Sequence, residues 1–192
     1  MVCEQTTEHR SHDTTGTDIL KILFLDHYGV LCLSKQAITR TELSMPDSDE
    51  FNDVDVFDNF DKDAVNILNN IIGVTGAEIV ISSDWKQHTT LNGMCEFYQK
   101  QGIKKMPIDY TAWLPGAPTY HEQRATEINA WLEQYPETSQ WAAIDDLYMG
   151  TWLTNFVWAK NVHLGINDIV VQQQLLDIFM RPMPQDLGIN NF

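Results

Sequence analysis

Residues 19–29 read ILKILFLDHYG, a continuous apolar run broken by Lys21 and ended by Asp26. Such a run is typical of a strand that is covered on both faces in a parallel sheet. Two later stretches have the same form: AEIVISSDW at residues 77–85 and WAAIDD at residues 141–146 are apolar segments that run into serine or aspartate. The sequence therefore predicts several buried parallel strands that end in polar side chains.

Amphipathic segments lie between these apolar runs. Apolar residues recur in them at helical spacing, which predicts helices at residues 64–72, 91–98, 122–135 and 170–179 and leaves shorter strands near residues 107–109 and 161–164. Asp61 stands where an N-cap is expected, and Gly73 or Gly76 stands where that helix would end. The alternation predicts an α/β fold: an open, mostly parallel sheet flanked by helices and joined by right-handed crossovers.

The length and composition predict a single domain. The 192 residues are 43% apolar, which suffices for a core, while residues 1–17 are polar and aperiodic. We expect a flexible tail over residues 1–17 and one domain over residues 18–192. The formal net charge of −15 disfavours an extended nucleic-acid-binding surface. Three cysteines without paired spacing, no signal peptide and no long apolar run predict a cytoplasmic protein that does not enter a membrane.

The polar residues at the strand ends are the candidates for chemistry. In open α/β sheets, ligands bind beyond the carboxyl ends of the strands. Asp26, Ser82 and the Asp145-Asp146 pair all follow predicted strands. Each one alone is as well explained as a residue that caps the next turn. Together they would converge on one crevice, where clustered carboxylates need a cation and hard oxygen ligands favour Mg²⁺.

These residues resemble the haloacid dehalogenase (HAD) superfamily. The first motif of that superfamily is an apolar strand followed by Asp-x-Asp-Gly, which stands here as LFLDHYG at residues 23–29. More narrowly, the chain is similar to the small HAD domains found in RNA-repair (Swiss Army Knife) proteins. The segments that carry this resemblance are FDKDAVNILN (60–69), IVISSDWK (79–86) and RATEINAWL (124–132). The resemblance extends over residues 19–170 and implies a Rossmann-like HAD fold.

The resemblance also implies roles for individual residues. Asp26 would be the nucleophile that forms an aspartyl-phosphate, and Ser82, or its neighbour Ser83, would position the phosphate. Arg124 takes the place of the basic residue of the third motif, which pairs with the nucleophile. Two alternatives stay open: Lys104 or Lys105 could fill that role, or Arg124 could be an exposed helix residue paired with Glu127 or Glu122.

The same resemblance implies a metal site. Mg²⁺ would be held by Asp26, Asp145, Asp146 and the backbone carbonyl of Tyr28. Phosphatases of the superfamily usually have a second aspartate, the general acid and base, where this chain has Tyr28. We therefore expect metal binding to be kept while turnover is in question.

Three functions are compatible with this substitution. The first is a Mg²⁺-dependent phosphohydrolase or phosphotransferase in which Tyr28, His27 or Asp84 handles the proton. The second is a catalytically silent binding or regulatory protein that has kept the HAD fold. The third and least favoured is a dehalogenase-type hydrolase, whose chemistry needs no metal.

The substrate is expected to reach an open site. The segment between the first two motifs, about 50 residues including a helix, is short for a large cap domain. We expect its acidic part, residues 34–63, to form a solvated loop or flap. An open site suits a phosphorylated substrate such as a polynucleotide end or a phosphoprotein, although the acidic charge disfavours long nucleic-acid contacts. The sequence leaves the oligomeric state open.

Overall fold

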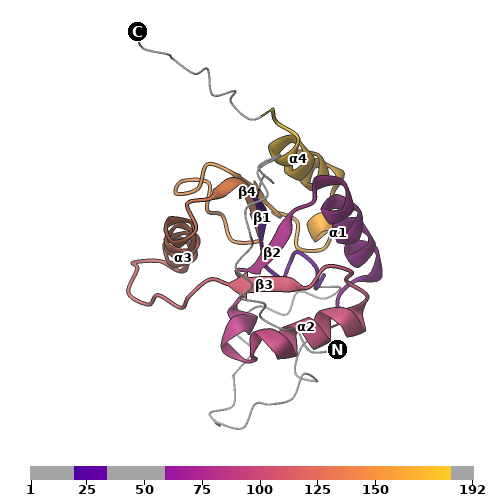
Figure 1. Cartoon of the computed structure of the whole chain (residues 1–192), viewed down its shortest axis with the longest axis horizontal. Coiled ribbons are helices and arrows are strands. Elements are labelled where there is room, and N and C mark those ends of the chain that lie inside the picture. Colours follow the sequence, from indigo (N-terminus) through magenta and orange to yellow (C-terminus); the bar gives the residue numbers. More distant parts are fainter. Residues whose placement is uncertain (1–19, 34–58, 183–192) are drawn as a thin grey trace, which may run out of the picture.

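The computed structural model describes residues 20–33 and 59–182 (Figure 1). Its centre is a five-stranded sheet with the strand order β3-β2-β1-β4-β5, in which all neighbouring strands are parallel. The prediction of an open parallel α/β sheet is confirmed. The strands are β1 (Leu20–Leu25), β2 (Glu78–Ile81), β3 (Pro107–Tyr110), β4 (Thr138–Asp145) and β5 (Phe156–Trp158).

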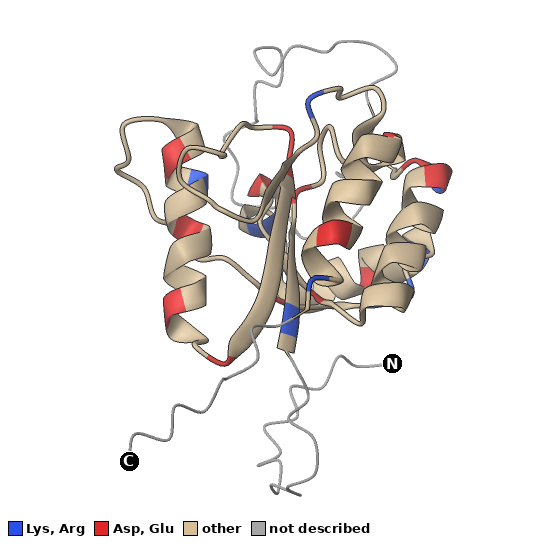
Figure 2. Cartoon of the chain, turned by 90° about the horizontal axis from the view of Figure 1, so that it is seen from above, with Lys and Arg blue, Asp and Glu red and all other residues tan. Residues whose placement is uncertain are grey.

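Helices cover both faces of this sheet. Figure 1 shows α3 on one side and α1 and α4 on the other, and Figure 2 shows the same separation from above. Side chains of α1, α2 and α4 build the larger apolar core, and those of α3 build the smaller one. The helices are α1 (Lys62–Thr75), α2 (Leu91–Gln101), α3 (Tyr120–Gln134) and α4 (Ile169–Phe179), with short 3-10 helices η3 (Asp84–Gln87) and η4 (Gly165–Asn167).

Strand β1 is buried on both faces because it lies between β2 and β4 under both helical layers. Leu23 and Leu25 point into the larger core, whereas Ile22 and Phe24 point into the smaller one. Phe24 meets Trp131 of α3 edge to face, with ring centroids 5.3 Å apart. This two-sided burial is the physical reason that the run at residues 19–25 is apolar at nearly every position.

Helix α1 begins and ends with the caps that its sequence supplies. The side chain of Asp61 accepts hydrogen bonds from the backbone N–H groups of Asp63 and Ala64, which the helix leaves without intrahelical partners. Gly76 ends the helix in the left-handed conformation, with φ of 70°. Of the two glycines considered as terminators, Gly73 lies inside the helix and Gly76 is the cap.

The prediction of a strand at residues 161–164 is wrong. The fifth strand is β5, five residues earlier in the chain, and it pairs with β4. Asn161 instead starts a turn: its side chain accepts from the backbone N–H of His163, and its carbonyl accepts from Leu164 and Gly165. Strand β4 also begins earlier than predicted, at Thr138.

Two predicted segments fall wholly or largely outside the described residues. These are the N-terminal tail at residues 1–17 and the acidic loop at residues 34–63, of which the structure describes only residues 59–63. The expectations for a tail and for the absence of a large cap therefore stay predictions. None of the helices in the described ranges is long and apolar enough to cross a membrane.

Candidate functional site

Four polar residues meet where the three central strands end. Asp26 follows β1, Ser82 follows β2, and Asp145 is the last residue of β4, with Asp146 next to it. Because β1 lies between β2 and β4, these ends are neighbours: the N–H of Asp26 bonds to the carbonyl of Ile144, and that of Ser82 to the carbonyl of Leu25. The sheet order thus brings together residues that are far apart in sequence.

Arg124 lies at the middle of this group. It is buried in the first turns of α3, and its Nη1 lies 3.1 Å from Asp26 Oδ1 and 2.9 Å from Asp145 Oδ2. Nη1 also donates to the backbone oxygen of Ser82, and Nη2 lies 2.6 Å from Asp84 Oδ1. Burial alone would lower the pKa of Arg124, but the charges of Asp145, Asp26 and Asp84 outweigh it and raise that pKa. The guanidinium is therefore a fixed positive charge.

Arg124 is consequently not the exposed helix residue that was considered as an alternative. Glu127 is paired with a different cation, and Lys105 pairs with Glu78 at 2.6 Å. Lys104 donates its backbone N–H to Asn69. Among the described residues, Arg124 is thus the cation that the structure places against Asp26.

Negative charge exceeds positive charge at this centre. Asp26, Asp84 and Asp145 contact one guanidinium, and oxygens of Asp26, Asp145 and Asp146 lie within 4.8 Å of one another. Burial, followed by the charge of Asp26, raises the pKa of Asp145 well above its ordinary value. A buried cluster of this kind is unfavourable without a further cation.

The donor set fits Mg²⁺. Hard oxygen ligands with room for water and phosphate are what this ion prefers. Asp146 Oδ1 is buried and has no hydrogen-bond partner within the described part of the chain. Asp145 Oδ2 accepts from Arg124 and Oδ1 accepts from the backbone N–H of Leu147, which fixes the carboxylate, while each oxygen keeps a second lone pair.

Ser82 supplies a second unsatisfied group. Its Oγ is buried and makes no hydrogen bond to the described residues, although its backbone is held on both sides by β1 and by Arg124. Ser83 is also buried, but it stands at the start of η3 and its side chain makes no capping bond. A buried hydroxyl without a partner costs stability unless a ligand bonds to it.

Gly29 allows the loop after β1 to approach Asp146. Its φ is 67°, and a Cβ at this position would lie 2.7 Å from the Cβ of Asp146. Any other residue would therefore be strained by its backbone and would push the two motifs apart. The side chain of Tyr28 lies edge-on to Trp85, with ring centroids 5.2 Å apart, and it is half buried. The role of its backbone carbonyl stays a prediction.

His27 lies beside the site but in an apolar surrounding. It is fully buried, its Nε2 lies 2.8 Å from the hydroxyl of Tyr98, and its ring contacts those of Phe60 and Trp85. Burial, reinforced by the positive charge of Arg124, lowers the pKa of His27 to about 3. The imidazole is therefore neutral at neutral pH and is a poor source of protons for catalysis.

A buried ion pair behind Arg124 was not found by sequence reasoning. Lys86 Nζ lies 2.6 Å from Glu127 Oε2, and the two side chains are 3% and 1% exposed. Nζ also bonds to Thr111 Oγ1 at 2.7 Å. The other oxygen of Glu127 accepts from Gln123 and from the backbone of Leu114.

This pair joins η3 to α3, the elements that carry Asp84 and Arg124. Burial lowers the pKa of Lys86, while the hydrogen bond to Glu127 acts in the opposite direction. The spacing of Arg124 and Glu127, three residues apart on one helix, was the available signal that both would face the sheet.

Comparison with known proteins agrees with the motifs. Residues 22–167 match the sequence model of the family described as the HAD domain in Swiss Army Knife RNA repair proteins. The chain belongs to this family. The resemblance inferred from the sequence is thereby confirmed, and the parallel sheet agrees with the HAD fold. Neither the curated proteins nor the solved structures yielded a match.

Proposed function

We propose that this HAD-family chain is a Mg²⁺-dependent phosphohydrolase or phosphotransferase that acts through an aspartyl-phosphate on Asp26. The observation that carries the proposal is the buried cluster of carboxylates around the single guanidinium of Arg124. Such a centre accepts a phosphoryl group only together with a cation, and phosphoryl transfer depends mainly on positioning and charge neutralisation.

The residues divide the work as follows. Asp26, Asp145, Asp146 and the backbone carbonyl of Tyr28 would hold Mg²⁺, which when bound would neutralise and orient the phosphate. The hydroxyl of Ser82, which has no partner among the described residues, donates to a phosphate oxygen. Arg124 keeps Asp26 ionised and offsets phosphate charge.

The reaction then has two steps. An oxygen of Asp26 attacks phosphorus, the bond to the leaving oxygen breaks, and that oxygen takes a proton from water. Next, water attacks phosphorus, its proton passes to Asp84, and the bond between Asp26 and phosphorus breaks, which restores the carboxylate. Asp84 is favoured over His27 because its side chain is 29% exposed and reaches the centre through Arg124, whereas His27 is enclosed.

Tyr28 lowers the expected rate without removing the reaction. General acid and base catalysis contributes typically about 10² to 10⁴ in rate. Water and Asp84 replace the usual second aspartate only in part. We therefore propose slow turnover, with binding of the phosphate and the metal kept.

The other two functions are less well supported. A catalytically silent binding protein is the main alternative, because Tyr28 stands in place of the usual acid. A dehalogenase-type hydrolase is disfavoured because its chemistry needs no metal and leaves the excess of buried carboxylates without a purpose.

The proposed substrate is a phosphorylated molecule that reaches the site at an exposed end. The family is described by its occurrence in RNA repair proteins, which favours a polynucleotide end over a phosphoprotein. The net charge of −15 argues that only the terminal nucleotides are contacted, because extended binding depends on neutralising many phosphates.

The decisive experiment is a phosphatase screen with Mg²⁺. The substrates are 3′-phosphorylated oligonucleotides, nucleoside monophosphates, phosphopeptides and an aryl phosphate, each tested with the wild type, Asp26→Asn and Tyr28→Asp. We expect slow wild-type release of phosphate that is lost with EDTA and in Asp26→Asn. We expect Tyr28→Asp to raise the rate by about 10² or more.

Thermal unfolding separates binding from turnover. Mg²⁺ should raise the Tm of the wild type, and it should raise the Tm of Asp26→Asn by a smaller amount. It should leave the Tm of an Asp145→Asn/Asp146→Asn double variant unchanged. Activity confined to Tyr28→Asp would select the silent binding protein. Release of halide from a 2-haloacid without metal would select the dehalogenase.

A further inference from the structure

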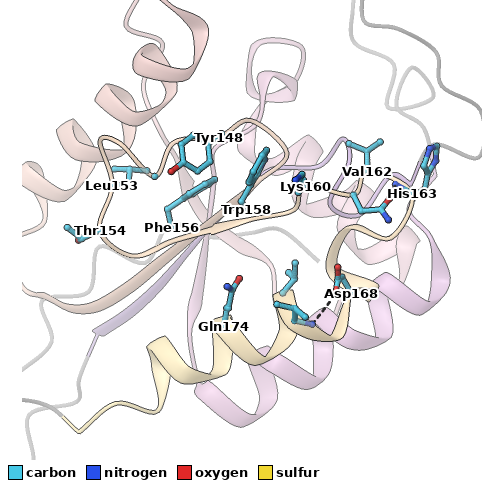
Figure 3. Close-up of a pocket in the computed structure, with 14 residues that line it drawn as sticks. Tyr148, Leu153, Thr154, Phe156, Trp158, Lys160, Val162, His163, Asp168 and Gln174 are labelled. Carbon is cyan, nitrogen blue, oxygen red and sulfur yellow. Dashed lines mark hydrogen bonds between the residues drawn. The ribbon is translucent and has the colours of Figure 1, made fainter.

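A hollow of about 860 Å³ lies between β5 and the start of α4, at the edge of the sheet (Figure 3). One wall is formed by the aromatic side chains of Tyr148, Phe156 and Trp158. The opposite wall is the start of α4, with Val170 and Gln174. The hollow therefore has an aromatic surface supplied largely by the edge strand β5, and none of the proposed catalytic residues lines it.

The aromatic wall is fixed to the acidic pair. Trp158 Nε1 donates to the backbone oxygen of Asp146 at 3.0 Å. Trp158 is also the residue of β5 that pairs with Asp145 of β4. Tyr148 follows Asp146 by two positions, and its carbonyl is bound to His121 Nδ1 at 2.9 Å. A group bound in the hollow would thus lie next to the site where the phosphate is proposed to bind.

The rings of this wall are exposed although they are large. Tyr148 is 44% and Trp158 is 37% exposed. The two rings meet edge to face with centroids 4.9 Å apart, and Tyr148 meets Phe156 in the same way at 6.0 Å. Such contacts hold the rings in place and leave aromatic surface facing water. A planar ring that covers this surface would gain both apolar burial and stacking.

Lys160 brings positive charge to the same wall. Its ammonium group lies 5.3 Å from the centroid of the Trp158 ring. A cation above an exposed ring contributes only about 0.5–1 kcal/mol, so an entering ligand can displace it. In a chain with 12 basic and 27 acidic residues, this placement favours a ligand with electron-rich or anionic substituents.

We propose that the hollow binds the planar ring of the leaving group of the substrate, with a nucleoside as the best fit. This inference rests on the proposed phosphoryl transfer for its role, but not for the binding itself. The volume lies in the range of about 300 to 1,000 Å³ that is usual for sites of drug-sized ligands, so a base with its sugar fits better than a lone phenyl ring. Trp158 stacks with the base, Tyr148 meets the base edge to face because the two rings are steeply inclined to each other, and Lys160 contacts its polar edge.

Binding can be tested without any phosphate chemistry. Adenosine is titrated into the full chain without metal, and the indole N–H signal of Trp158 is followed by NMR and assigned by its loss in Trp158→Phe. We expect the signal to shift and Trp158→Ala to weaken adenosine binding roughly tenfold, the size expected for one stacked base. Trp152→Ala is the matched control, because Trp152 is 40% exposed but does not line the hollow.

Kinetics tests the link to the site. For Trp158→Ala, we expect kcat/KM to fall roughly tenfold more with AMP than with an alkyl phosphate, which has no ring. The fall with the alkyl phosphate measures the effect of losing the hydrogen bond from Trp158 to Asp146. A loss with phenyl phosphate but none with AMP would assign the hollow to a single ring and overturn the nucleoside proposal. Equal effects in Trp152→Ala and Trp158→Ala would overturn it as well.

The outcomes separate the two proposals. If adenosine shifts Trp158 but no phosphate is released from any substrate, the hollow is a nucleoside site and the proposed function fails. If phosphate is released but adenosine leaves the Trp158 signal in place, the proposed function holds and the inference fails. A shift produced by an extended peptide and by no nucleoside would assign the edge of β5 to strand pairing instead.

Discussion

Helices α1 and α3 cover opposite faces of the same sheet, and their buried sides have different chemistry. Helix α1 buries almost only apolar side chains, whereas α3 buries Gln123, Arg124 and Glu127 beside Ala125, Ile128 and Trp131. Both sides are equally well hidden from water. The apolar side is stable because it is uniform, while the charged side is stable only if each charge keeps its partner.

The contrast teaches that burial alone does not separate core from site. Arg124 and Leu68 are both excluded from solvent, yet one is held by three carboxylates and the other by dispersion and the hydrophobic effect. Removing atoms from each side should therefore have different consequences. Four measurements of the free energy of unfolding, by denaturant titration, test this difference.

The largest effect is expected on the charged side. Lys86→Met leaves Glu127 buried without its cation, which should lower the free energy of unfolding by about 3–5 kcal/mol. The double variant Lys86→Met/Glu127→Leu removes both charges and should recover much of that loss. If the double variant is no more stable than the single one, the pair is not the source of the effect.

A comparable but smaller loss is expected on the apolar side. Leu68 of α1 is fully buried, and Leu68→Ala should cost about 3 kcal/mol through lost burial and the cavity left behind. Ile67→Ala, at the half-buried neighbour, should cost less. In contrast to the charged side, no second substitution that removes a partner should restore stability.

His27, which packs against Phe60, Trp85 and Tyr98 of the larger core, should contribute a pH dependence. Its folded-state pKa of about 3 lies below the ordinary value of 6.5, so the unfolded chain binds the proton first. Stability is therefore fully present above about pH 6.5 and falls as the pH drops toward 3, by roughly 2 kcal/mol between pH 6.5 and 5. His27→Gln should lack this slope, and the exposed His163→Gln should keep it.

The smallest effect is expected for a pair outside both cores. Lys105 and Glu78 lie 2.6 Å apart, but their side chains are 36% and 29% exposed. Lys105→Ala should change the free energy of unfolding by less than about 1 kcal/mol, and added salt should reduce the difference. A loss as large as that of Lys86→Met would mean that exposure does not govern the strength of these pairs.

Most of the sheet could be predicted from the sequence because β1, β2 and β4 are apolar runs with polar ends. The helices followed from their spacing, and Asp61 marked the start of α1, while its end was left between Gly73 and Gly76. Strand β5 could not be predicted from the sequence, because its three residues, Phe156–Trp158, are too few to show the alternation of a strand. The turn at Asn161 was missed because the apolar residues that follow it in the sequence are typical of a strand.

The sequence predicted most of the residues of the candidate site, but it did not predict most of the contacts between them. The motifs named Asp26, Ser82, Arg124 and the Asp145-Asp146 pair, and the strand order explains their approach. Two contacts of the site join segments that are far apart in sequence. Arg124 and Asp84 are separated by 40 residues, and Lys86 and Glu127 by 41. Such contacts depend on the packing of α3 against η3, which no local pattern encodes.

The position of β1 in the middle of the sheet has a consequence for how the chain folds. Arg124 and Asp26 are 98 residues apart in sequence, and β1 pairs with both β2 and β4. Contacts of such high sequence separation require the closure of long loops and form slowly. The acidic centre therefore has no counterpart in a partly folded chain that lacks β4. We therefore expect an incompletely folded molecule without β4 to carry none of the chemistry of the native one.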